Sequence, residues 1–176
     1  MVSVARFLAY SLFFVLVLMY LMPKSSIYYF FERQIKPYSI VINNESVKDR
    51  GLGLKVTDAT VFIKSIDSAQ IGSIEVDLFA LFNAIDIKDV TLSSVAAAVM
   101  PLHIQEVHIR HSILNPLQIT VYGEGEIGVF HASFNLLDRL LNVNLKPSET
   151  MLKEYKSTLT NLKRSEKGEY IYEKTI

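Results

Sequence analysis

The chain has 176 residues with 18 basic and 18 acidic side chains, so its formal charge at pH 7 is zero. No basic excess is present to attract nucleic acid, and we expect no nucleic-acid partner. The absence of cysteine excludes disulfides and thiolate metal sites.

The first predicted element is the uncharged stretch Phe7–Met22, which follows Arg6 and ends at Pro23. As a helix this stretch rises about 24 Å, slightly less than the ~30 Å hydrocarbon core of a bilayer. Arg6 can snorkel toward the headgroups, which extends the span. A cleaved signal peptide is the alternative, but no small residues that suit a cleavage site precede Pro23. We therefore predict an uncleaved transmembrane anchor in residues 1–23.

The predicted anchor side chains are large and apolar: Phe7, Leu12, Phe13, Phe14, Leu16, Leu18 and Leu21. Their natural partner is the lipid bilayer. The charges that flank the span slightly favour a cytoplasmic main domain. The short N-terminal tail is nevertheless typical of a signal anchor that stays in the cytoplasm. We predict a single-pass protein of the bacterial inner membrane with its main domain in the periplasm.

Residues 24–37 are predicted to form a juxtamembrane helix. Ser25 or Ser26 can cap its start, and Pro37 stops it. Its apolar residues recur at helical spacing, so the helix has one apolar face. That face either lies at the membrane surface or packs on the core of the following domain.

Residues 38–147 alternate apolar and polar side chains, which is the pattern of strands with one buried and one solvated face. This pattern predicts a mainly β protein whose main domain is a twisted antiparallel sheet. The apolar face is either a filled core or an open lipid-binding surface. Its candidate residues are Ile74, Val76, Val107, Ile109, Ile119 and Val121.

Three details of this domain follow from single residues. Apolar side chains move from even to odd positions at Gln105–Glu106, which indicates a bulge or a turn. The glycines of residues 123–125 predict a hairpin turn. A second turn at Leu137–Asp138 would place Phe134 opposite Leu141.

Residues 148–176 are predicted to form a C-terminal helix and a short strand. Ser148 is placed to cap the helix, and Glu149 suits its first turn. The strand contains Tyr170 and Tyr172. The helix carries an apolar stripe at 3/4 spacing, namely Leu152, Tyr155, Leu159 and Leu162.

No group of residues has the spacing of a catalytic or metal site. His103, His108 and His111 are the best metal candidates, but in an extended strand the first and last lie about 26 Å apart. A shared zinc ion requires ligands about 2 Å from the metal. Neither a nucleophile elbow nor a phosphate-binding loop is present. We therefore expect no enzyme, no catalytic residues, no cofactor and no metal.

The order of the parts resembles the type II secretion system protein N family, which is related to AsmA-like envelope proteins with β-rich, groove-like domains. The segments that carry the resemblance are MPKSSIYYFFERQI, GLGLKVTDATVFIK, IGSIEVDLFALF and GEGEIGVFHASFNLLDRLLNVNLKPS. The N-terminal span also matches, and the resemblance covers most of residues 20–147. The resemblance implies no catalytic residues.

Two functions are compatible with this resemblance. The first is a non-enzymatic component of an envelope machine, type II secretion, that presents a periplasmic β surface to other envelope or secretion-system proteins. The alternative is a lipid carrier or bridge, as in AsmA-like proteins or the bitopic component of lipopolysaccharide export. A filled apolar face would favour docking, and an open face would favour lipid.

Overall fold

The computed structural model describes residues 2–43, 45–78, 81–95, 100–165 and 168–175. Within them, one sheet of eleven strands forms the body of the protein. In chain order the strands are β1 (Ile40–Asn43), β2 (Ser46–Asp49), β3 (Gly53–Ile63), β4 (Ile66–Leu78), β5 (Phe82–Leu92), β6 (His103–Ser112), β7 (Asn115–Gly125), β8 (Gly128–Asn135), β9 (Leu140–Pro147), β10 (Lys163–Arg164) and β11 (Tyr170–Thr175).

All neighbouring strands of the sheet run antiparallel. From β3 to β9 each strand pairs with the next in the chain, and β1 and β2 both pair with β3. At the other edge, β9 pairs with β11, which pairs with β10. The predicted mainly β, antiparallel domain is therefore confirmed.

The described helices lie before and after the main run of strands. They are α1 (Val2–Leu21), α2 (Lys24–Ile35), the 3₁₀-helix η1 (Lys36–Tyr38), α3 (Glu149–Glu154) and α4 (Lys156–Thr160). α2 confirms the helix predicted after residue 23. Its N-cap residue is Pro23, and neither Ser25 nor Ser26 provides a capping side chain.

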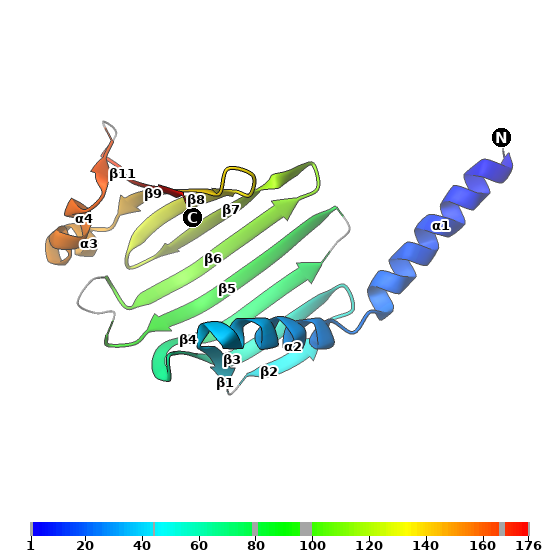
Figure 1. Cartoon of the computed structure of the whole chain (residues 1–176), viewed down its shortest axis with the longest axis horizontal. Coiled ribbons are helices and arrows are strands. Elements are labelled where there is room, and N and C mark those ends of the chain that lie inside the picture. Colours follow the sequence, from blue (N-terminus) through cyan, green and yellow to red (C-terminus); the bar gives the residue numbers. More distant parts are fainter. Residues whose placement is uncertain (1, 44, 79–80, 96–99, 166–167, 176) are drawn as a thin grey trace.

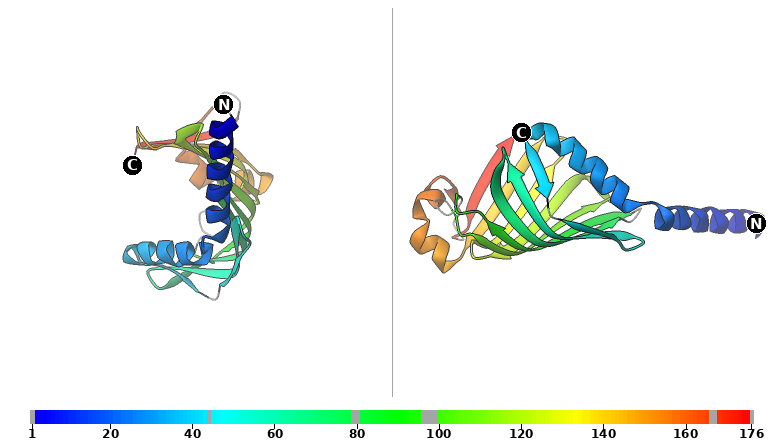
Figure 2. Two further views of the ribbon diagram at one scale, coloured as in Figure 1. Left: turned by 90° about the vertical axis from the view of Figure 1, so that its right-hand side faces the viewer. Right: turned by 90° about the horizontal axis from the view of Figure 1, so that it is seen from below.

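The sheet is strongly curved and has a concave and a convex face (Figure 2). α2 lies inside the curve, against the first strands. α1 extends away from one end of the sheet, and α3 and α4 lie at the opposite end (Figure 1). The helices therefore mark two different ends of the sheet.

α1 contains the stretch predicted to be the transmembrane anchor. At all seven predicted anchor positions the side chains are exposed, with 50% to 70% of their surface accessible. Among the described residues, no helix combines the length and the apolar character that a membrane crossing requires. This finding gives the predicted span no support, and α1 is an N-terminal helix with exposed apolar side chains.

The predicted irregularity at Gln105–Glu106 is confirmed. The register between β6 and β7 shifts between Ile104 and Glu106. A one-residue slip exchanges the two faces of a strand. The shift therefore lets the apolar side chains before and after Gln105 share one face of the sheet.

Similar parity changes occur in β3 and β5. Asp58 and Asp89 have positive φ angles of 58° and 56°, which is unusual for residues other than glycine. Before Asp58 the buried residues of β3 occupy even positions, as Val56 does. After Asp58 they occupy odd positions, as Ala59 does. Alternation along each strand is thus broken at a few residues while the apolar face continues.

The turns of the sheet agree in part with the predictions. The hairpin between β8 and β9 is confirmed, because Phe134 and Leu141 are cross-strand partners. The hairpin predicted at the glycines is present between β7 and β8, but its turn lies at residues 126–127 and not at 123–125, since β7 continues to Gly125 and β8 begins at Gly128. Gly123 lies opposite Phe130, whose ring fills the space that a Cβ would need. This glycine allows close packing within a strand rather than a chain reversal.

The C-terminal region contains two short helices, so the prediction of one continuous helix is wrong. Tyr155 separates them with non-helical backbone angles, φ −118° and ψ 32°. The cap is confirmed, because the Met151 backbone N–H donates to Ser148 Oγ over 3.1 Å. The expected apolar stripe begins one residue early, since Met151 is buried and Leu152 is exposed. The predicted final strand is present as β11.

Candidate functional site: the concave face of the sheet

The strand register brings the predicted apolar residues onto one face, because cross-strand partners point to the same side of a sheet. One row of partners across β3 to β6 consists of Val56, Ile74, Ile87 and Val107. The next row, which extends to β7, consists of Leu54, Val76, Ile85, Ile109 and Val121. Ile119 lies two residues before Val121 and shares its face. All six predicted positions therefore lie on the same side.

α2 covers this apolar face over the first strands. Tyr28 of α2 packs against the buried cluster of Leu54, Val56 and Ala59. Burial raises the pKa of the Tyr28 phenol. Since α2 lies inside the curve of the sheet (Figure 2), the apolar face is the concave one.

α3 and α4 cover a second part of the apolar face. The row that contains Val107 continues through Gly123 and Phe130 to Leu145. Leu145 is buried together with Met151 of α3 and Leu159 of α4. The two ends of the apolar face are thus closed by different helices.

The centre of the concave face is not covered by either helical cluster. Its apolar side chains are only half-buried, namely Ile85, Ile87, Val107, Ile109, Val121 and Val143. None of the described helices belongs to a buried cluster with these residues. Five strands spaced by ~4.8 Å make this uncovered surface about 19 Å wide along the sheet. A continuous apolar surface that no helix of these clusters covers can serve as an interaction or ligand site.

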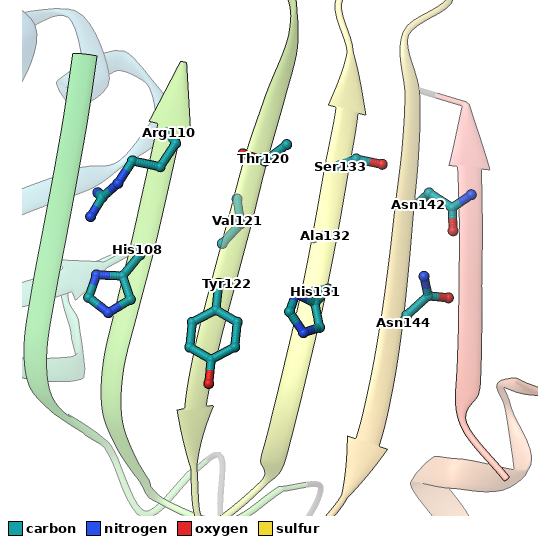
Figure 3. A pocket seen from close by; sticks show the side chains of 10 residues that line it. All are labelled: His108, Arg110, Thr120, Val121, Tyr122, His131, Ala132, Ser133, Asn142 and Asn144. Atoms are coloured by element: carbon teal, nitrogen blue, oxygen red, sulfur yellow. The ribbon is translucent and has the colours of Figure 1, made fainter. Parts of the chain in front are cut away.

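The other face of the same strands carries polar side chains, and several of them line the pocket shown in Figure 3. One row of partners from β3 to β9 consists of Lys55, Glu75, Asp86, His108, Tyr122, His131 and Asn144. Successive side chains of a strand point to opposite faces, so this row alternates with the apolar rows. One side of the sheet is therefore polar and the other is apolar.

An ion-pair network lies on the convex face. Asp86 Oδ1 is 2.6 Å from Arg110 Nη2 and 2.5 Å from His108 Nδ1. The hydrogen bond to Asp86 raises the pKa of His108. Partial burial would raise the pKa of Asp86, but the hydrogen bonds from His108 and Arg110 outweigh it and lower this pKa.

Sequence reasoning missed this network because Asp86 and His108 are far apart in the chain. The pattern contained a usable signal: both occupy even positions between apolar odd positions, and the register makes them partners. The arrangement joins three adjacent polar groups on two strands. Its chemistry is that of a surface ion pair, with both His108 and Asp86 about one quarter exposed.

The three histidines considered as metal ligands are not brought together. His108 faces the convex side with Asp86, whereas the register places His111 opposite Ile119 on the apolar face. The His111 ring Nε2 is 3.1 Å from the Pro116 carbonyl oxygen. Within the described part of the chain, no three potential metal ligands form a cluster.

Comparison with protein-family models, curated protein sequences and solved structures finds no match for this chain. The resemblance to the type II secretion system protein N family remains a prediction from the sequence.

Proposed function

We propose that this protein binds the acyl chains of membrane lipids on the uncovered centre of its concave face, and that it acts without catalysis as a lipid carrier or bridge in the bacterial envelope. The observation that carries the proposal is the half-buried apolar surface between the two helical clusters. Covering apolar surface is favourable by about 25 cal/mol per Å². Acyl chains are apolar along their length and can cover several strands at once.

The N-terminal helix supports a position at a membrane. Large apolar side chains are exposed at consecutive positions from Leu12 to Leu16, so they surround the helix rather than forming one stripe. A helix that is apolar on all sides requires an apolar environment. We propose that α1 is embedded in the inner membrane and that it holds the sheet in the periplasm. A reporter enzyme fused after Ile176 should then be active in the periplasm, and activity in the cytoplasm would contradict this orientation.

A docking function in type II secretion is the second candidate, and one observation favours it. β10 pairs with only the first two residues of β11, Tyr170 and Ile171. In the described residues, the outer edge of β11 from Tyr172 to Thr175 has no further strand partner. An open edge can accept a strand from another protein. The half-buried centre of the concave face is not needed for such docking, and for that reason lipid binding is preferred.

Lipid retention by the purified full-length protein tests the proposal. The protein would be extracted from membranes and transferred to a detergent-free polymer, and its phospholipid would be counted by mass spectrometry. The register and the alternation of side chains along a strand place Val121→Asp on the concave face and Thr120→Asp at the adjacent position on the convex face. Both variants keep α1, so lipid held around that helix is equal in all samples.

We expect the wild-type protein and Thr120→Asp to retain similar amounts of phospholipid and Val121→Asp to retain less. Equal amounts in all three proteins would contradict lipid binding on the concave face. A crosslink from Glu173 to a secretion protein, combined with equal lipid content, would favour the docking function instead.

A further inference from the structure

Three adjacent hairpin turns carry large apolar side chains at their tips. They connect β4 to β5, β6 to β7 and β8 to β9. The exposed apolar residues of these turns form what we call the apolar rim: Leu81, Phe82, Ile113, Leu114, Leu136 and Leu137. Leu114 is 92% exposed and Leu137 is 72% exposed. The rim is therefore an apolar surface separate from the concave face.

The composition of the rim is unusual for hairpin turns. Turns are normally formed by Gly, Asn, Asp, Pro and Ser, and exposed apolar residues are normally scattered singly. Here each of three turns presents a pair of large apolar side chains. Backbone hydrogen bonds also hold the turns in place, from Ile113 N–H to Leu81 O at 2.9 Å and from Leu136 N–H to Leu117 O at 2.8 Å. The rim is consequently a fixed row rather than three independent loops.

The rim lies at the end of the sheet from which α1 extends (Figure 1). The first turn of this end, between β2 and β3, touches the junction of α1 and α2. There the Lys24 backbone N–H donates to Asp49 Oδ2 over 2.9 Å, and a Cβ on Gly51 would lie 2.6 Å from the Tyr20 ring. Leu78 N–H donates to Leu52 O over 3.1 Å and connects this turn to the end of β4. The end of α1 and the rim thus belong to one continuous end of the molecule.

We propose that the apolar rim inserts into the surface of the same bilayer that holds α1, so that the concave face opens directly onto membrane lipid. This inference rests on the proposed function, because it requires α1 to be in the membrane. The bilayer is the occupant because the rim adjoins the apolar helix α1. Insertion would let an acyl chain move from the bilayer to Ile109 and Val121 without crossing water.

The opposite end of the sheet offers a matched control. The turn between β3 and β4 contains Lys64 and Ser65 between two isoleucines, and Ile66 is 55% exposed. The proposal places this turn in water, far from the membrane. Any environmental probe at Ile66 should therefore report water, although the residue replaced is also an exposed apolar one.

Site-directed spin labelling tests the inference with the full-length chain in vesicles of phosphatidylethanolamine and phosphatidylglycerol. The chain has no cysteine, so single variants Phe14→Cys, Leu114→Cys, Leu137→Cys and Ile66→Cys each give one label. Collisions with oxygen, which concentrates in lipid, are compared with collisions with a water-soluble nickel complex. We expect preference for oxygen at positions 14, 114 and 137, and preference for nickel at position 66.

The outcomes separate the two proposals. If position 14 reports lipid while positions 114 and 137 report water, the rim does not insert and the membrane helix still stands. If position 14 also reports water, α1 is outside the bilayer. In that case neither the proposed membrane position of α1 nor the insertion of the rim holds. If position 66 reports lipid, the sheet lies flat on the membrane and rim insertion is wrong.

Discussion

Charges placed at two positions of the concave face should have very different effects on stability. Val56 is fully buried beneath α2, whereas Val121 is half-buried in the uncovered centre. An unpaired carboxylate buried at Val56 costs several kcal/mol, which approaches the ~5–15 kcal/mol that stabilises a typical domain. Val56→Asp should therefore fail to fold.

Val121→Asp should be tolerated, because its carboxylate can reach water. Most of the ~1.5–3 kcal/mol for burying a valine is lost, together with up to ~1 kcal/mol of strand preference. The total of about 2 kcal/mol lowers the melting temperature by roughly 4–8 °C in a domain of this size. Circular dichroism of the full-length chain in detergent micelles measures this change. If Val121→Asp unfolds as completely as Val56→Asp, the centre of the concave face is covered and the lipid-binding reasoning fails.

Three further predictions concern the convex face, the packing of the strands and the C-terminal region. The raised pKa of His108 stabilises the fold most below its unfolded value of about 6.5, and this contribution is lost as pH rises through the folded pKa. Thermal melts should therefore show decreasing stability above about pH 6.5, and His108→Gln should make the melting temperature depend less on pH. The same pH dependence in His108→Gln and in the wild type would contradict the role of the Asp86 pair. Gly123→Ala should destabilise the sheet because its Cβ meets the Phe130 ring, and adding Phe130→Leu should relieve part of this loss. If denaturant titrations show that the losses of the two single variants simply add in the double variant, the contact is contradicted. Ser148→Ala should cost about 1 kcal/mol in the same titrations, and Ser157→Ala, which removes no cap, should cost little.

The sequence predicts the sheet well where alternation is unbroken. Ile74, Val76, Ile109 and Val121 alternate with polar neighbours, and the register places them on one face. The shift at Gln105 was also predictable, because a change of parity has a direct structural meaning. Local pattern is sufficient for these features since neighbouring residues determine which face a side chain occupies.

Features that depend on distant residues could not be predicted in this way. Gly123 looked like a turn residue, and only the position of Phe130 in the next strand explains why it lies within β7. Met151 is buried in one cluster with Leu145 of β9 and Leu159 of α4, which the local pattern around Met151 does not show. The apolar rim was not recognised because its turns become neighbours only in the folded sheet.

Photocrosslinking along β7 in living cells tests the central claim most directly. A photoreactive amino acid would replace each residue from Gln118 to Tyr122 in turn, and lipid adducts would be detected by mass spectrometry. Ile119 and Val121 share the concave face, whereas Thr120 and Tyr122 point to the convex face. We predict lipid adducts at positions 119 and 121 and none at 118, 120 and 122. Adducts of equal yield along the strand, or adducts only at the even positions, would contradict lipid binding on the concave face.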